Sequence, residues 1–266
     1  SDGEDILDYD ALSNKMKDVD IVVHLAAIAG QNIAWKLPRA TMEVNIIGTY
    51  NVLNAMVEHN VKHIVFSSTS EVYGPEVDNA KEDEPIMQGP PQEIRWMYAT
   101  SKLACENLCY AYKLKYDMKI TILRYFNIYG EAQDKTGHTG ALGIFVRKAI
   151  AGEPITINND GKQVHTWCHV DDCIKGTLLS MEKDEAEGEV FNIGNLSTKM
   201  TIKELAEKVI EVTGSDVKLE YVTMEKPDIK MRVPNTDKAK KVLGFEAKVG
   251  IDEGIQRVAA WHKKQS

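Results

Sequence analysis

Short apolar runs alternate with longer helical patterns in the first half of the chain, and this alternation constrains the fold more than any other feature. The runs are residues 21–23, 64–66 and 120–123. A run this short, followed by apolar residues at helical spacing, is typical of a buried strand followed by a helix. Strands that alternate with helices build β-α-β units. We therefore predict an α/β fold with a doubly wound parallel sheet.

Helices are expected after the first two runs. The first begins at Pro38, a favoured first helical residue because its ring fixes φ and its missing N–H is not needed there. Its apolar positions are Met42, Ile46, Tyr50, Leu53, Met56 and Val57. The second extends from about Trp96 through Tyr116. Residues 74–95, which precede it, are rich in Pro, Glu and Asp. We expect them to form a surface loop that can reach over a site.

The pattern changes after Gly152. Apolar runs at 155–157, 190–193 and 217–221 predict isolated strands among amphipathic helices. Thr201 and Glu204 have the spacing of a capping box, Gly214 ends that helix, and a last helix covers about 251–263. We therefore expect a first domain over residues 1–152 and a smaller mixed α/β substrate lobe, mainly over 153–266. Segments of the two can interleave.

Residues suited to chemistry follow the second strand. Its end carries a run of hydroxyl side chains that includes Thr69, and Tyr98 and Lys102 lie four residues apart on the next helix. Residues at this spacing share a helix face, so the ammonium of Lys102 can lower the pKa of the Tyr98 phenol. A phenolate can take a proton from a hydroxyl while hydride leaves the carbon. Thr69 can hydrogen-bond that same hydroxyl and orient it.

Charge and composition exclude several functional classes. A formal net charge of −8 argues against nucleic acid or an anionic membrane as partner, since both require a basic surface. No apolar stretch is long enough for a membrane span, and the acidic start is unlike a signal peptide. His165 and His169 lie on an extended segment, so no metal site is expected. The cysteines lack zinc spacing, and we expect reduced thiols in a cytoplasmic protein: Cys105, Cys109, Cys168 and Cys173.

Five segments carry a resemblance to a known family. They are residues 24–27 (HLAA), 45–49 (NIIGT), 67–74 (SSTSEVYG), 98–102 (YATSK) and 124–130 (RYFNIYG). With them the chain resembles, from about Asp5 to its end, the extended short-chain dehydrogenase/reductases that act on nucleotide sugars. The resemblance implies a Rossmann-like fold and NAD as cofactor. It also implies a nucleoside-diphosphate sugar, in most cases a UDP-sugar, as substrate, and a homodimer built from the two long helices.

The resemblance assigns roles to individual residues. It implies that Tyr98 is the base, that Lys102 also holds the nicotinamide ribose, and that Thr69 binds substrate. Asn127 would contact the sugar diphosphate, and Asn192 matches a family signature of the small lobe. The remaining expected cofactor contacts are Ala26, Ala27, Asn45 and Tyr125.

Other positions resemble the UDP-glucuronic acid decarboxylases in particular. Ser70 and Glu71 match their pattern, and Arg232 falls where they keep a catalytic arginine that also binds substrate. The 4,6-dehydratases carry Asp at the position of Ser70, so dehydration is disfavoured. Two features depart from the family: its diphosphate-binding arginine is His165 here, and residues 137–143 hold no arginine to bind a substrate carboxylate.

Three functions follow from these features. The leading expectation is an epimerase: Tyr98 deprotonates the 4-hydroxyl, hydride leaves C4, and hydride returns to the opposite face. The second is decarboxylation through the same 4-keto intermediate, helped by Glu71 and Arg232. The third, for a chain that natively begins at Ser1, is a truncated non-catalytic homologue that binds a nucleotide or a partner.

The glycines do not supply the expected cofactor turn. Gly137, Gly140 and Gly143 have the spacing of a pyrophosphate-binding fingerprint, but no apolar strand leads into them, so we interpret them as part of a flexible substrate-side loop. We expect the first strands of the sheet, with the true glycine-rich turn, to lie upstream of Ser1. The 266 residues alone are accordingly expected to bind NAD weakly, with a dissociation constant above roughly 1 mM.

Overall fold

The computed structural model describes residues 5–133, 140–225 and 228–265, and they form two compact units. The first unit combines Ser1–Gly74, Pro85–Arg124 and Thr177–Phe191. The second combines Pro75–Glu84, Tyr125–Gly176 and Asn192–Ser266. The units therefore interleave along the chain, and no single boundary near Gly152 separates them. The division into a cofactor domain and a substrate lobe stays a prediction.

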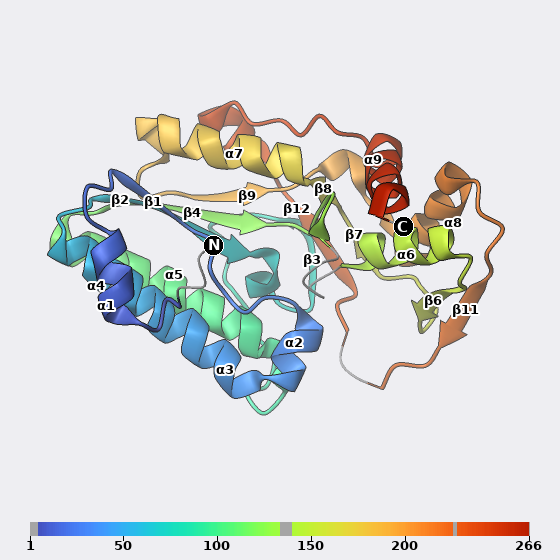
Figure 1. Ribbon diagram of the computed structural model, residues 1–266, viewed down its shortest axis with the longest axis horizontal. Helices are drawn as coiled ribbons and strands as arrows, with labels where there is room; N and C mark the ends of the chain where they lie inside the picture. The colour runs from blue at the N-terminus through green and yellow to red at the C-terminus, as the bar shows by residue number, and fades with distance from the viewer. Residues whose placement is uncertain (1–4, 134–139, 226–227, 266) are drawn as a thin grey trace. The chain divides into compact units, whose positions relative to one another are not determined.

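The first unit is built on a four-stranded sheet with the order β1-β2-β4-β9. The predicted runs form β1 (Ile21–His24), β2 (His63–Thr69) and β4 (Lys119–Tyr125), joined at the edge by β9 (Val190–Ile193). β1 and β2 are parallel, with Ile21 opposite His63. Helices α1 (Tyr9–Lys15), α4 (Gly48–Glu58) and α5 (Met97–Tyr116) cover one face of this sheet (Figure 1). The α/β prediction is confirmed.

The helical stretch that begins at Pro38 contains a π-helical turn. Pro38 is the first residue of α3 (Pro38–Met42), as predicted, and the π-helical segment Glu43–Ile47 connects it to α4. Short helix α2 (Gln31–Lys36) precedes it. A β-carbon on Gly48 would collide with the side chain of Ile6, so glycine here permits close packing of the α1 segment against α4.

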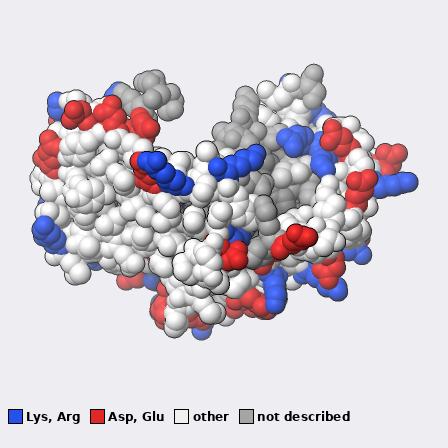
Figure 2. Space-filling model, turned by 90° about the horizontal axis from the view of Figure 1, so that it is seen from below, with Lys and Arg blue, Asp and Glu red and all other residues white. Residues whose placement is uncertain are grey.

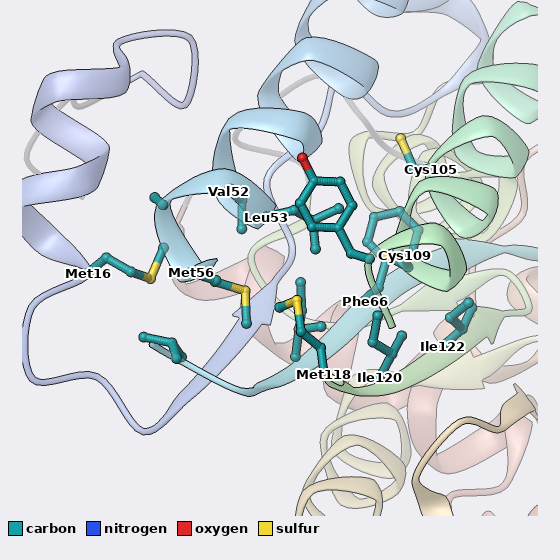
Figure 3. Packing of buried hydrophobic residues seen from close by; sticks show 14 of the residues in the cluster. Met16, Val52, Leu53, Met56, Phe66, Cys105, Cys109, Met118, Ile120 and Ile122 are labelled. Atoms are coloured by element: carbon teal, nitrogen blue, oxygen red, sulfur yellow. The ribbon is translucent and has the colours of Figure 1, made fainter. Parts of the chain in front are cut away.

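The core of the first unit lies between this sheet and these helices. Leu53 and Met56 of α4 are fully buried, and they pack in one cluster with Phe66 of β2 and with Ile120 and Ile122 of β4 (Figure 3). These are the apolar positions that the helix and strand patterns predicted. Burial of this surface provides the main stabilisation of the unit.

The second unit contains one mixed sheet and two short parallel pairs. The mixed sheet has the order β10-β7-β12-β3, and the pairs are β11-β6 and β5-β8. Its strands are β3 (Glu76–Ala80), β5 (Ile128–Tyr129), β6 (Ile155–Asn158), β7 (Val164–His165), β8 (Cys168–His169), β10 (Met200–Thr201), β11 (Leu219–Val222) and β12 (Met231–Pro234).

Three helices complete the core of the second unit: α6 (Ala141–Ala151), α8 (Ile202–Thr213) and α9 (Ile251–Gln265). The predicted capping box is present at α8, where Thr201 accepts from the backbone of Glu204 and the Glu204 side chain accepts in return. Gly214 follows in the left-handed conformation. Helix α7 (Val170–Glu182) begins in a chain segment of the second unit and ends in a segment of the first. No helix in the described part of the chain is long and apolar enough to cross a bilayer.

The expectation of a surface loop over residues 74–95 is wrong for part of that segment. Residues 76–80 form β3, which pairs in parallel with β12, and Ile94–Trp96 form a 3-10 turn that leads into α5. β3 is mostly exposed and polar, so it carries no apolar run. Its partner lies far along the chain, and local sequence does not reveal such a pairing.

We predict that Leu53→Ala lowers the free energy of unfolding by roughly 2–5 kcal/mol, because it leaves a cavity in the packed core. Leu114→Ala on α5 is the matched control, since Leu114 is 87% exposed. It should change that free energy by less than about 0.5 kcal/mol. Urea denaturation followed by circular dichroism measures both. Equal effects of the two substitutions would contradict the core assignment.

Candidate active site

A tight turn at the end of β2 positions the first candidate residues. Thr69 is the last residue of β2 and caps the 3-10 turn Ser70–Tyr73, where its Oγ1 accepts from the backbone N–H of Glu71 at 3.2 Å. Gly74 ends the turn at φ +86°, and a β-carbon there would strike the carbonyl of Met87. The turn therefore fixes Thr69 and Glu71 at the carboxyl end of a parallel strand, where α/β sheets bind ligands.

Lys102 joins helix α5 to the same strand end. It is only 3% exposed, and its Nζ donates to the carbonyl of Ser67 at 2.6 Å. The ammonium also lies 4.8 Å from the ring centre of Phe66. Burial lowers the pKa of Lys102 to about 8, while the nearby charge of Glu106 acts to raise it. The ammonium is thus held in the interior at the end of β2.

Tyr98 lies one turn before Lys102 and is half-buried. Burial raises the pKa of its phenol well above the usual value, the charge of Glu71 raises it further, and a hydrogen bond with Thr69 lowers it in part. The sequence predicted instead that Lys102 lowers this pKa. In the structure the ammonium of Lys102 is directed to Ser67, and burial dominates. Thr69 and Tyr98 do meet, as the sequence predicted.

Glu71 belongs to a partly buried ion pair. Its carboxylate contacts Nη1 of Arg95 at 2.5 Å, and only 20% of the Glu71 side chain is exposed. The guanidinium of Arg95 lies 5.1 Å from the ring centre of Trp96. The sequence assigned no role to Arg95. Its position three residues before Tyr98 is the signal that could have drawn attention to it.

Asn45 performs an internal role that the sequence did not predict. It is buried in the π-helical turn, and its side chain accepts from the backbone N–H of Ile28 at 2.8 Å and donates to Ser101 Oγ at 2.9 Å. Ser101 in turn donates to the carbonyl of Tyr98. Asn45 therefore connects the loop after β1 to the helix of Tyr98. Ala26, which is exposed, and Ala27, which is half-exposed, follow β1 and remain predicted cofactor contacts.

The second unit holds the other candidates. Asn127 Nδ2 donates to the carbonyl of Thr166 at 2.8 Å, and Tyr125 is half-buried at the end of β4. Arg232 is fully buried on β12, where it lies opposite His165 of β7 in parallel register. Partners in a parallel pair share a sheet face, so the two basic side chains are neighbours. Their roles toward a substrate stay predictions, as does the role of Ser70.

Asn192 and the three glycines at 137, 140 and 143 are the remaining motif residues. Asn192 is buried and donates to the carbonyls of Ala80 and Asn235. Gly137 lies outside the described residues, Gly140 caps α6, and Gly143 is buried within α6. Within the described ranges no group of three or more His, Cys, Asp or Glu side chains could hold a metal ion.

Comparisons with known proteins agree with this geometry. The family model described as the NAD dependent epimerase/dehydratase family matches residues 3–194. A UDP-N-acetyl-alpha-D-glucosaminuronate decarboxylase of Bacillus cytotoxicus is 33% identical over 97% of this chain and 81% of its own length. A UDP-glucuronate 4-epimerase of Thermodesulfobacterium geofontis is 31% identical over 98% of this chain and 78% of its own length.

Solved structures show the same fold. The UDP-glucose 4-epimerase of Thermotoga maritima with UDP-glucose has a TM-score of 0.91 at 31% identity, over 98% of this chain and 84% of that one. The UDP-glucuronic acid 4-epimerase of Bacillus cereus, in complex with UDP-glucuronic acid and NAD, has a TM-score of 0.89 at 29% identity, over 99% of this chain and 81% of that one. By family match, sequence identity and fold, this chain belongs to the NAD-dependent epimerase/dehydratase family.

Proposed function

We propose that the protein is a nucleotide-sugar 4-epimerase that acts on a UDP-sugar through transient oxidation at C4. The observation that carries the proposal is the meeting of Thr69 and Tyr98 at the end of β2, with Lys102 buried one turn later. A hydroxyl donor or acceptor beside a phenol is suited to bind and deprotonate an alcohol. The related 4-epimerases of UDP-glucose and UDP-glucuronate support the substrate class.

The described residues fit the nicotinamide side of an NAD site. The exposed Ala26 and the half-exposed Ala27 follow β1, while the half-buried Tyr98 and the buried ammonium of Lys102 come from α5. When bound there, NAD⁺ would supply the hydride acceptor for C4. In the first unit, the residues that would hold it are Ala26, Ala27, Asn45, Tyr98 and Lys102, and the contact from Tyr125 stays a prediction of the sequence.

Proton transfer falls to the chain's own residues. Thr69 orients the 4-hydroxyl, and Tyr98 accepts its proton and later gives it back. Because burial and Glu71 hold the pKa of Tyr98 high, the phenol needs a compensating positive charge to act as base near neutral pH. Oxidised nicotinamide carries such a charge.

A second function, decarboxylation of a UDP-uronate, is supported by Glu71. The 4-keto intermediate makes a C6 carboxylate a β-keto acid, which loses CO₂. An acid paired with Arg95 next to Tyr98 is placed to assist this loss, and the related decarboxylase of Bacillus cytotoxicus supports it. Asn127 remains the proposed contact for the sugar diphosphate, and Arg232 remains the proposed substrate-binding arginine that would help the loss of CO₂.

We also propose a homodimer formed through the α4 and α5 helices. Ile47 and Tyr50 are each 48% exposed. The ring of Tyr50 meets the ring of Tyr112 edge-on, with 6.3 Å between the ring centres. The aromatic surface of α4 therefore continues onto α5. Figure 2, which shows the molecule from below relative to the view of Figure 1, has a broad area with few charged side chains at the left.

The four free cysteines support the expected cytoplasmic location.

Tyr98→Phe should lower kcat by roughly 10²–10⁴, because it removes only the phenolic proton acceptor. The assay uses the complete gene product with UDP-glucose and UDP-glucuronate, and circular dichroism checks that the fold is retained. Near wild-type kcat in this variant would mean that Tyr98 is not the base.

Product analysis separates the two reactions. After incubation with UDP-glucuronate, mass spectrometry should give an unchanged product mass, and NMR should show a new sugar configuration at C4. A product lighter by one CO₂ would instead establish the decarboxylase and exclude the epimerase as the main activity.

Light scattering at micromolar protein should give a dimer mass. The double substitution Ile47→Glu and Tyr50→Glu should give a monomer, because charges would be buried at the interface without partners. Leu196→Glu, an exposed apolar residue of the second unit, is the control and should remain dimeric. A monomeric wild-type protein would contradict the proposed dimer.

A further inference from the structure

A buried ionic network lies beneath the candidate site of the first unit, and the proposed chemistry does not use it. Arg124, at the end of β4, donates from Nε and Nη2 to the two carboxylate oxygens of Glu106 on α5, at 3.0 and 2.7 Å. Both side chains are at most 5% exposed. A bidentate pair of this kind is strong and directional. Burying two charges is nevertheless costly, and a well-packed apolar pair would often be as stable.

Each end of this ion pair reaches the turn that carries the candidate residues. Glu106 accepts a short hydrogen bond from the hydroxyl of Ser68, the residue directly before Thr69. Arg124 Nη1 donates to the phenol oxygen of Tyr73 at 2.9 Å, and Tyr73 ends the 3-10 turn that holds Glu71. The network therefore holds the turn after β2 at two points, through Ser68 before Thr69 and through Tyr73 after Glu71.

The same network is fixed to the helix of the proposed base. Glu106 follows Lys102 by four residues and Tyr98 by eight, so all three lie near one face of α5. Two contacts thus join α5 to the end of β2: Lys102 to the Ser67 carbonyl, and Glu106 to the Ser68 hydroxyl. Moving Glu106 would move Ser68, and with it Thr69, relative to Tyr98.

We propose that Glu106 is a positioning residue of the active site, which with Arg124 holds Thr69 in register with Tyr98 and Lys102. This inference rests on the proposed function, because it assigns Thr69, Tyr98 and Lys102 to the reaction. Glu106 itself touches neither substrate nor cofactor in this assignment. It acts through Ser68 and through its charge.

The charge of Glu106 acts on Lys102. The titratable groups that face Lys102 are Cys105, Cys109 and Glu106 from its own helix and His24 from β1. Burial raises the pKa of both thiols and lowers the pKa of His24 to about 3, so these three groups are neutral near pH 7. The carboxylate of Glu106, which pairs with Arg124, is then the neighbour whose charge favours the protonated form of Lys102.

The pH dependence of kcat/KM is expected to follow the protonation of Lys102. An ammonium required for activity is lost as pH rises through the pKa of Lys102, which is about 8. Removing the negative charge at Glu106 lowers that pKa further. The alkaline limb of the kcat/KM profile therefore shifts to lower pH in Glu106→Gln.

The test measures the kcat, KM and pH profile of the complete gene product. In Glu106→Gln we expect kcat to fall by up to about a hundredfold through misplacement, with the KM for the UDP-sugar changed by less than about threefold. Ser68→Ala keeps the ion pair and removes only its link to the strand. It should lower kcat by about threefold or more without moving the alkaline limb.

A matched control separates positioning from stability. Met118→Ala removes a buried side chain of the same core, and it should lower the melting temperature while kcat and the pH profile stay unchanged. If Glu106→Gln does not fold, Ser68→Ala still decides the positioning. Unchanged kcat in Ser68→Ala, or an unmoved alkaline limb in a folded Glu106→Gln, overturns the inference. If the wild-type protein turns over no UDP-sugar, the proposed function itself is wrong.

Discussion

The buried ammonium of Lys102 is the constraint around which the first unit is organised. A cation in an apolar interior is costly unless hydrogen-bonded and balanced by charge. The carbonyl of Ser67 supplies the hydrogen bond, the face of Phe66 a favourable quadrupole, and the carboxylate of Glu106 the charge. Glu106 comes from α5 itself, but the carbonyl and the ring both belong to β2, so Lys102 reaches them only because α5 lies against the end of β2. That placement brings Tyr98 to Thr69.

The second unit depends on pairing between distant segments. Its mixed sheet joins strands that begin at residues 76, 164, 200 and 231, and β12 sits between β3 and β7. Arg232 is buried on that inner strand. Its burial therefore depends on strands that come from distant parts of the chain. The chain must pass between the units several times to build this sheet, which is why one boundary could not describe them.

Local signals predicted most of the fold, while partners distant in sequence were missed. The apolar runs identified β1, β2 and β4, Pro38 marked a helix start, and Thr201 with Glu204 marked another. β3 was missed because its residues are polar and its partner is non-local. The i, i+4 spacing of Tyr98 and Lys102 predicted that both lie on one helix, and both lie on α5.

The ion pairs of the site and the pKa of Tyr98 could not be predicted from the sequence. The partner of Glu71 lies 24 residues away and that of Glu106 lies 18 away, and neither spacing identifies an ion pair. The pKa of Tyr98 was predicted in the wrong direction for the same reason. Spacing on a helix shows which side chains share a face, whereas the depth of burial and the direction of the Lys102 ammonium depend on β2, which spacing does not show.

Glu71 and Arg95 form a charged pair near Tyr98 that would act differently on uronates and on neutral sugars. Glu71 is close enough to Tyr98 to raise the pKa of the phenol. A sugar whose 4-hydroxyl meets Tyr98 carries C6 only two bonds from C4, so a C6 carboxylate would enter the field of the same pair. Unpaired, Glu71 would repel that carboxylate by several kcal/mol at about 4 Å, and the Arg95 guanidinium offsets this repulsion. A neutral C6 hydroxymethyl group interacts only weakly with the charges of Glu71 and Arg95. Under the proposed function, the balance between these two charges therefore acts on uronates and leaves neutral sugars almost untouched.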